Sequence, residues 1–278
     1  MKVLFDELSQ DVSRAVTKKY STSFSLGILA LGPAIRPAIY AIYGYVRLAD
    51  EIVDSFHDYN KKLLLEQLKD QTWQALDDGI SINPILQSFQ EAVNKHKIDR
   101  ALIERFLRSM QMDLAAIDYN TESYKEYIIG SAEVVGLMCL KVFTEGNDEA
   151  YNTMKPYAMK LGSAFQKVNF LRDMKDDYHI LGRTYFPDIN MDVFDHQIKL
   201  SIEKDIESEF KEALIGIKKL PVSSKFGVYL AYKYYLSVLS KIKQTPAQKI
   251  LKERIRIPNG QKLSLMMSSY VQYKMSIL

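Results

Sequence analysis

Two pairs of aspartates are the residues of this sequence best suited to chemistry. Asp50 and Asp54 are four residues apart, and so are Asp173 and Asp177, more than a hundred residues further along the chain. In an α-helix, residues four apart lie on the same face, so each pair can direct two carboxylates toward one small volume. An isolated pair with this spacing is usually part of a solvated helix face, so the neighbouring residues have to decide between the two interpretations.

The neighbouring residues extend both pairs into longer polar stripes with helical spacing. Tyr43 and Arg47 precede the first pair, and Gln166 and Asn169 precede the second. The stretch 38–56 is otherwise mostly apolar, which leaves little of that helix for solvent. Buried carboxylates must be paired, protonated or bound to a cation, and two opposed acidic pairs would repel each other strongly. The sequence therefore predicts cations between the two stripes.

The residue types indicate which cation and which ligand. The four histidines are scattered and the chain has one cysteine, so no zinc-type cluster is predicted. Carboxylates suit Mg²⁺, with Mn²⁺ as a substitute, and Mg²⁺ usually shares its coordination with water and phosphate oxygens. Arg47 and Arg172 could each neutralise a carboxylate or bind a phosphate, and the sequence leaves both roles open. No ATP-binding, nicotinamide-binding or hydrolase motif is present, so no nicotinamide cofactor is expected.

Helical spacing of apolar residues runs through almost the whole chain and predicts an all-α fold. With 278 residues, 47% hydrophobic and 26% charged, the chain has an ordinary globular composition, and we expect a single domain over 1–278. The predicted helices are 6–20, 34–57, 61–78, 84–96, 100–117, 122–144, 148–180, 196–219, 223–243 and 261–276. Pro156 is expected to kink or divide the seventh of these.

Capping residues and glycines mark several of the predicted helix ends. The predicted N-caps are Asn83, which precedes a proline, and Asp99, and the predicted stops are Gly79, Gly146 and Gly182. The segment 182–187 follows the second aspartate pair directly, and we expect this loop to cover the mouth of the site.

Charge and apolar content bear on location and partners. The net charge is +3, yet residues 217–278 contain twelve Lys or Arg and one acidic residue, Glu253. A solvated surface is the ordinary explanation, and peripheral contact with an anionic membrane is the alternative. The sequence has a single cysteine, Cys139, no signal-peptide pattern and no apolar run of about 18 residues. These features predict a cytoplasmic protein that does not span a membrane and that makes peripheral contact with the inner membrane face. No nucleic-acid-binding motif accompanies the basic residues, and the sequence does not indicate an oligomeric state.

Taken together, these motifs resemble those of the squalene/phytoene synthase family, most closely its bacterial phytoene synthases. The resemblance covers nearly the whole chain. Its motifs are YSTSF at 20–24, YAIY at 40–43, RLADEIVD at 47–54, YxxG at 127–130, AxxVG at 132–136, QKVNFLRDMKDDY at 166–178 and GRTYFP at 182–187.

The resemblance implies a helical isoprenoid-synthase (terpenoid synthase) fold with a central active-site cavity. It implies head-to-head condensation of two geranylgeranyl diphosphates to phytoene through a cyclopropylcarbinyl (prephytoene) diphosphate, with release of diphosphate, in carotenoid biosynthesis. The implied catalytic residues are Asp50, Asp54, Asp173, Asp177, Arg47 and Tyr43, and the four aspartates together with Asn169 would hold the metal. The implied substrate-binding residues are Ser21, Ser23, Phe24, Tyr127, Ala132, Val135, Gly136, Gln166, Asn169, Arg172 and Tyr235.

Several of these residues also have a purely structural interpretation. Ser21 could be a helix cap, the aromatic residues could be ordinary core, and Gly130 and Gly136 could serve close backbone packing. Thr22 stands where relatives often have a basic residue, so one phosphate contact is either missing or supplied elsewhere, by Arg183 or by the basic C-terminal segment. For Glu51, beside the first aspartate pair, we expect a role outside the metal's immediate ligands.

Other functions remain open at the level of sequence. A squalene or dehydrosqualene synthase would use the shorter farnesyl diphosphate, and only pocket depth separates the two. A noncatalytic helical scaffold is a further alternative, since fold does not guarantee function, although the retained aspartates oppose it. A terpene cyclase or chain-elongating prenyltransferase is opposed by the pattern QxxNxxRD at 166–173.

Overall fold

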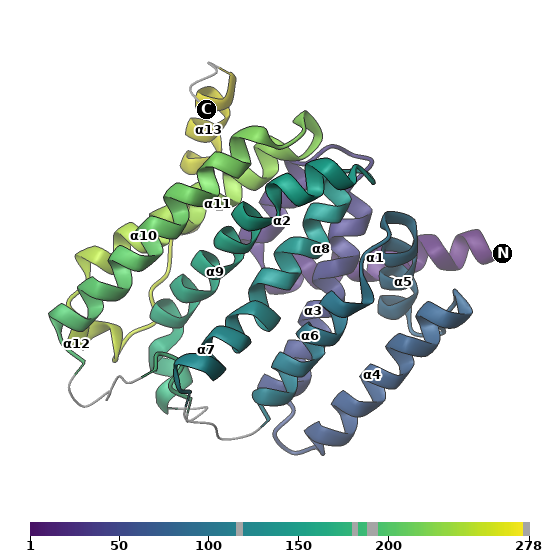
Figure 1. Ribbon diagram of the computed structural model, residues 1–278, viewed down its shortest axis with the longest axis horizontal. Coiled ribbons are helices and arrows are strands. Elements are labelled where there is room, and N and C mark those ends of the chain that lie inside the picture. The colour runs from purple at the N-terminus through teal and green to yellow at the C-terminus, as the bar shows by residue number, and fades with distance from the viewer. Residues whose placement is uncertain (115–118, 180–182, 188–193, 275–278) are drawn as a thin grey trace.

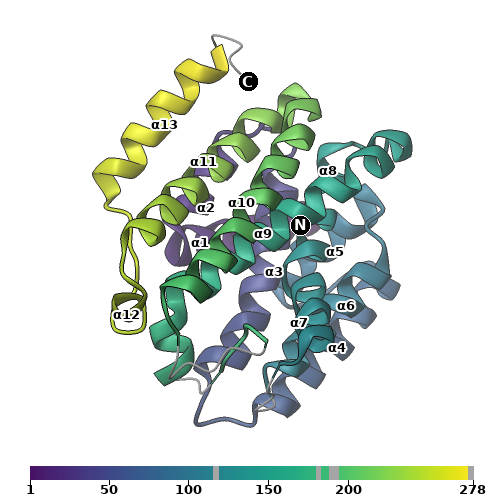
Figure 2. The same cartoon turned by 60° about the vertical axis from the view of Figure 1, so that its left-hand side comes forward.

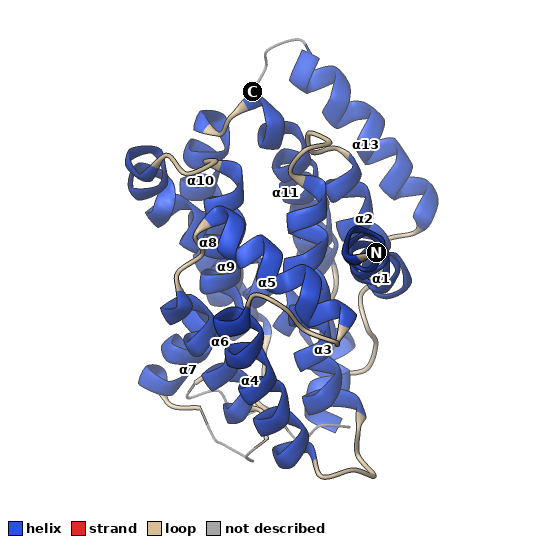
Figure 3. Cartoon of the chain, turned by 90° about the vertical axis from the view of Figure 1, so that its right-hand side faces the viewer, coloured by secondary structure: helices blue, strands red, loops and turns tan. Residues whose placement is uncertain are grey.

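Helices account for all regular secondary structure in the part of the chain that the computed structural model describes, residues 1–114, 119–179, 183–187 and 194–274 (Figure 3). The all-α prediction is therefore confirmed. The elements are α1 (Lys2–Tyr20), α2 (Thr22–Leu29), α3 (Arg36–Ser55), α4 (Lys61–Asp78), α5 (Pro84–His96), α6 (Arg100–Met112), α7 (Thr121–Ile128), the π-helix η1 (Ile129–Glu133), α8 (Val134–Phe143), α9 (Asp148–His179), α10 (His196–Lys219), α11 (Val222–Gln244), α12 (Ala247–Ile250) and α13 (Asn259–Lys274).

Local capping chemistry places several helix ends where the sequence predicts them. The Asn83 side chain accepts a hydrogen bond from Ile85 N–H at 3.0 Å, and Asp99 accepts one from Ala101 N–H at 2.9 Å. Gly79 follows α4 with φ of 68°, a left-handed conformation that glycine adopts without strain. Gly146, with φ of 86°, follows the end of α8, whereas Gly182 lies outside the described residues.

The structure differs from the predicted helices in three places. The short helices α2 and α12 were missed because each lies only one or two residues from a long helix. The predicted helix 122–144 is not one α-helix, since the π-helix η1 separates α7 from α8. Pro156 does not divide α9, which continues from Asp148 to His179; the proline is exposed, and packing of α9 against α8 and α10 outweighs one lost hydrogen bond.

The helices form two groups that meet at α8 and α9. Helix α3 packs against α1 and α5, and α8 joins this group through α3 and α6. Helix α9 packs along α10, and α11 contacts α2, α10 and α13 (Figures 1 and 2). The first group has a buried core around Tyr45, which stacks on Phe89 at 3.9 Å between ring centroids. The second core contains Phe170 and Phe210.

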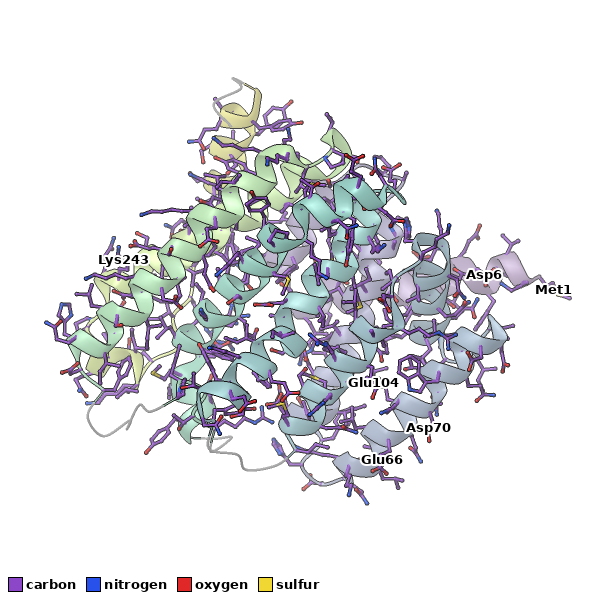
Figure 4. All side chains as sticks on the ribbon, in the orientation of Figure 1. Met1, Asp6, Glu66, Asp70, Glu104 and Lys243 are labelled. Atoms are coloured by element: carbon purple, nitrogen blue, oxygen red, sulfur yellow. The ribbon has the colours of Figure 1, made fainter. Side chains whose placement is uncertain are left out.

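Acidic residues with the spacing of the two aspartate pairs also occur on the outside. Glu66 and Asp70, four residues apart on α4, are exposed, and Figure 4 shows both at the edge of the molecule. This is the solvated helix face that such spacing usually indicates. In the described residues, no helix combines the length and apolar character that a bilayer span requires.

Candidate active site

A cavity of about 770 Å³ lies between the two groups of helices, with walls from α2, α3, η1, α8, α9 and α11. Its volume is within the range of about 300–1,000 Å³ typical of small-molecule sites. Every residue that the sequence singled out for the site is on its wall. These residues are Ser21, Ser23, Phe24, Tyr43, Arg47, Asp50, Asp54, Tyr127, Ala132, Val135, Gly136, Gln166, Asn169, Arg172, Asp173, Asp177 and Tyr235.

The two aspartate pairs lie at the same end of this cavity. Asp50 and Asp54 belong to the last two turns of α3, and Asp173 and Asp177 to the last two turns of α9. Burial raises the pKa of Asp50 to about 7, and the charge of Asp54 adds to the shift. Burial also raises the pKa of Asp177 to about 8, with further repulsion from Asp173 and from Asp54 across the cavity. The pairs are therefore close enough for their charges to interact.

A further carboxylate, which sequence analysis missed, joins this acidic end. Asp113 is the C-terminal cap of α6 and is buried. Burial raises its pKa to about 6, although the Arg183 guanidinium and a hydrogen bond from Tyr127 oppose the shift. The Tyr127 hydroxyl donates to Asp113 Oδ2 at 2.8 Å. Asp113 has no acidic partner at helical spacing, so nothing in the local pattern distinguishes it from an ordinary cap.

The loop after the second pair supplies a cation to the first pair. Arg183 Nη1 lies 2.8 Å from Asp54 Oδ1, and Nη2 donates to the backbone oxygen of Asp113 at 2.9 Å. Only 10% of the Arg183 side chain is exposed, and Tyr185 beside it also lines the cavity. The described part of this loop, 183–187, thus reaches the acidic end of the cavity through Arg183 and Tyr185.

The basic C-terminal segment supplies a cation to the second pair. Arg254 Nε lies 2.7 Å from Asp173 Oδ1, and Arg172 donates to both carboxylate oxygens of Asp173, at 3.1 and 2.6 Å. The backbone N–H of Ile255 donates to the Arg172 oxygen at 3.3 Å, which ties this segment to α9. The basic segment stands out in the sequence as a whole, but nothing in the local pattern distinguishes Arg254 from the other basic residues.

The remaining cation of the first stripe is paired within α3. Arg47 forms an ion pair with Glu51, and its guanidinium carbon lies 4.3 Å from the Tyr20 ring centroid. Of its two possible roles, the structure shows neutralisation of a carboxylate, with the guanidinium still on the cavity wall. Ser21 is a cap, because its hydroxyl accepts from Phe24 N–H at 3.2 Å, and it lines the cavity as well.

Aromatic rings cover the wall between the acidic end and the apolar interior. The Phe24 ring centroid lies 5.5 Å from that of Tyr43 and 6.2 Å from that of Tyr235. The Tyr235 ring stacks on the Phe165 ring at 3.9 Å between centroids. The Tyr235 hydroxyl donates to Asn169 Oδ1 at 3.2 Å. Burial raises the pKa of Tyr43 to about 12, so its phenol stays neutral.

The π-helix and α8 form the wall opposite α11, and their glycines have different roles. Gly130 serves close packing, since a Cβ there would lie 2.7 Å from the Arg105 backbone oxygen of α6. Gly136 lines the cavity, and its Cβ would lie 3.2 Å from the Ala158 backbone oxygen, so it serves both purposes.

The donor set at the acidic end fits Mg²⁺ bound together with a phosphate. In the described part of the chain, no three His, Cys, Asp or Glu side chains are already arranged to hold a metal ion. Mg²⁺ does not require such a cage, because it usually binds one or two carboxylates and completes its shell with water and phosphate oxygens. The raised pKa values of Asp50 and Asp177 show that the site accumulates negative charge that a cation would offset.

An all-helical fold around an apolar cavity with acidic residues at one end is the architecture of terpenoid synthases, and solved structures agree. A dehydrosqualene synthase in complex with a ligand superimposes with a TM-score of 0.84 over 97% of this chain and 98% of its own, at 22% identity. The chain belongs to the squalene/phytoene synthase family, whose model matches residues 17–261.

Curated relatives include both a phytoene synthase and a 4,4'-diapophytoene synthase. The chain is 27% identical to 4,4'-diapophytoene synthase of Staphylococcus haemolyticus, over 93% of this chain and 95% of that protein. It is 26% identical to the chloroplastic phytoene synthase 1 of Solanum lycopersicum, over 92% of this chain. The chain spans 66% of the length of the Solanum protein.

Proposed function

We propose that this enzyme joins two molecules of geranylgeranyl diphosphate head to head to form phytoene, a step of carotenoid biosynthesis. The reaction passes through a cyclopropylcarbinyl (prephytoene) diphosphate and releases two diphosphates and two protons, one proton as the cyclopropane forms and one as the final double bond forms. The observation that carries the proposal is the division of one cavity into an end with five aspartates and a long apolar interior. Such a cavity matches a ligand that has an anionic head and a hydrocarbon tail.

Magnesium would be held at the acidic end by Asp50 and Asp54 on one wall and by Asp173 and Asp177 on the other, with Asn169 beside the second pair. When bound, Mg²⁺ would neutralise the diphosphate and stabilise the negative charge that develops as it leaves. Mn²⁺ would serve as a substitute, since it accepts the same oxygen ligands.

The arginines at this end are suited to bind and orient the diphosphate. Arg183, Arg172 and Arg254 are each paired with a site aspartate. When a metal ion takes over those carboxylates, the guanidinium groups become free to donate to phosphate oxygens, which accept bidentate hydrogen bonds. Arg183 or Arg254 would then supply the basic contact that Thr22 does not provide.

The aromatic wall would protect the carbocation formed when diphosphate leaves. Phe24, Tyr43 and Tyr235 offer ring faces, which attract a cation without forming a bond to it. Because the Tyr43 phenol is neutral, it does not act as a competing nucleophilic anion. The apolar side chains further inside exclude water, which would otherwise capture the cation as an alcohol.

The spacing of two cavity residues along α9 supports the C20 substrate. Tyr157 lines the cavity and precedes Asp173 by sixteen residues on α9, which at about 1.5 Å per residue places it about 24 Å along the helix. From carbon–carbon bonds of about 1.5 Å, an extended isoprene unit spans about 5 Å, so a geranylgeranyl chain spans about 20 Å and a farnesyl chain about 15 Å. With a few ångströms for the metal and phosphate, the longer chain reaches Tyr157 and the shorter one stops before it.

Farnesyl diphosphate is the alternative substrate. The similarity of the chain to a staphylococcal 4,4'-diapophytoene synthase and to a dehydrosqualene synthase of solved structure supports this alternative. The test is to incubate the purified protein with Mg²⁺ and each diphosphate separately and to identify the hydrocarbon by mass. We expect a C40 product from geranylgeranyl diphosphate, and no product in EDTA. A C30 product from farnesyl diphosphate alone would overturn the chain length. No hydrocarbon from either substrate would overturn the reaction and favour a noncatalytic scaffold.

We further propose that the enzyme works as a peripheral protein at the inner face of a membrane, where its hydrocarbon product dissolves. Val222, Met267 and Val271 are 80%, 64% and 53% exposed. The contact between the Phe226 and Tyr270 rings brings this part of α13 to the start of α11. Exposed apolar side chains beside the basic C-terminal segment would suit an anionic lipid surface.

A further inference from the structure

The apolar end of the cavity is closed by side chains from three helices. Phe143 of α8, Met154 of α9 and Leu220, which follows α10, line this end and are buried. Tyr157 of α9 also lines it, but this side chain is partly exposed. The exposed Lys219 beside Tyr157 places this residue between the cavity and the surface.

The outer side of the Tyr157 ring is in contact with the surface of α10. The Lys219 ammonium lies 5.2 Å from the Tyr157 ring centroid, and Lys219 is exposed. Phe143, Met154 and Leu220 are held within packed cores, so shortening one of them would leave an enclosed void. Shortening Tyr157 instead removes the ring that separates the end of the cavity from the surface.

A glycine on α10 fixes the position of Tyr157. A Cβ at Gly216 would lie 2.3 Å from Tyr157 Cβ and 2.9 Å from its Cγ. Glycine is otherwise unfavourable in the interior of a helix such as α10, and here its missing side chain allows α10 to approach the base of the tyrosine closely. The contact involves atoms next to both backbones, so the backbone of α10 lies directly against the base of the Tyr157 side chain.

We propose that Tyr157, held in place by Gly216, forms the end of the prenyl-chain channel and sets the longest chain that the enzyme accepts. The proposal rests on the head-to-head function and deepens it, because it assigns the limit on substrate length to one side chain. A chain one isoprene unit longer than geranylgeranyl would need about 5 Å more and would collide with the ring.

The experiment compares Tyr157→Ala, Tyr157→Leu and Tyr157→Phe with the unaltered enzyme in a mixture of geranylgeranyl and geranylfarnesyl diphosphates. The products are the C40 hydrocarbon from two C20 chains and the C45 hydrocarbon from one C20 and one C25 chain. Because a steric mismatch in an apolar pocket commonly changes selectivity by a factor of about ten or more, we expect Tyr157→Ala to raise the C45:C40 ratio at least about tenfold. Tyr157→Leu should give a smaller rise, and Tyr157→Phe, which keeps the ring, none.

The matched control is Tyr59→Ala, which removes an exposed tyrosine distant in sequence and absent from the cavity wall. It should leave the product ratio unchanged. Circular dichroism checks that each variant is folded, and Tyr157→Leu carries the test if the alanine variant is not. An unchanged C45:C40 ratio in folded Tyr157→Ala and Tyr157→Leu would overturn this inference and leave the proposed function intact. An unaltered enzyme that makes no hydrocarbon overturns the proposed function itself. An unaltered enzyme that uses only farnesyl diphosphate overturns the inference, because that chain ends before Tyr157.

Discussion

Replacing Asp177 by asparagine should stabilise the metal-free protein, and the gain should grow with pH. An ordinary aspartate has a pKa of 3.8, and burial with repulsion from Asp173 raises the pKa of Asp177 to about 8. Between these values the folded state binds more protons than the unfolded state, so the free energy of unfolding of the unaltered protein falls as pH rises. The Asp177→Asn variant has no such group to ionise, so its free energy of unfolding lacks this contribution to the fall with pH.

The magnitude follows from the shift in pKa. At about 1.36 kcal/mol per pKa unit, ionising Asp177 at pH 8 costs the folded state at most about 6 kcal/mol. The carboxylate is partly exposed, so solvent screening reduces the cost, and we expect about 3 kcal/mol at pH 8 and about 1 kcal/mol at pH 5.5. For a chain of this size, 1 kcal/mol corresponds to a Tm change of about 2–4 °C. The variant should therefore melt about 8 °C higher at pH 8 and about 3 °C higher at pH 5.5.

The assay is thermal unfolding in EDTA across this pH range, followed by circular dichroism. Asp176→Asn is the matched control, because it makes the same change one residue away, at a position that does not line the cavity. Adding Mg²⁺ at pH 8 should raise the Tm of the unaltered protein more than that of the variant. A Tm difference that stays constant or shrinks between pH 5.5 and 8 would refute the electrostatic argument. Near-normal turnover by Asp177→Asn would refute the role of this residue in the reaction.

Three further outcomes test the site and the surface. Asp50→Asn or Asp173→Asn should lower turnover at least about a hundredfold while leaving helicity intact, because each removes negative charge where the metal-bound diphosphate leaves. Near-normal activity in either variant would contradict the metal assignment. Arg183→Gln should lower kcat/KM by about tenfold to a hundredfold, because a charge-assisted contact is worth about 1.5–3 kcal/mol, and an unchanged value would exclude this arginine from diphosphate binding. Vesicles that contain anionic lipid should bind the protein, and both high salt and the Met267→Asp substitution should weaken this binding. Equal binding to neutral vesicles would contradict the electrostatic part of the membrane proposal.

Most of the helices could be predicted from the sequence, because helix formation depends on local chemistry. Capping by Asn83 and Asp99, the left-handed Gly79 and helical spacing of apolar residues are properties of short segments. The sequence also identified both walls of the site, since the polar stripes that end in Asp54 and Asp177 interrupt apolar helices. It missed η1 and did not decide whether Pro156 divides α9, because packing between helices determines whether an irregular segment remains helical.

Which acidic residues face one another, and where the cavity ends, depends on how the helices pack together. Glu66 and Asp70 have the same spacing as Asp50 and Asp54, yet the first two lie in solvent and the second two share a cavity. Asp113 and Arg254 carry no local signal, because their partners are distant in sequence and come close only when α6 and the C-terminal segment pack against α3 and α9. Spacing along a helix fixes which side chains share a face, but burial and the charges across a cavity depend on the other helices that pack there.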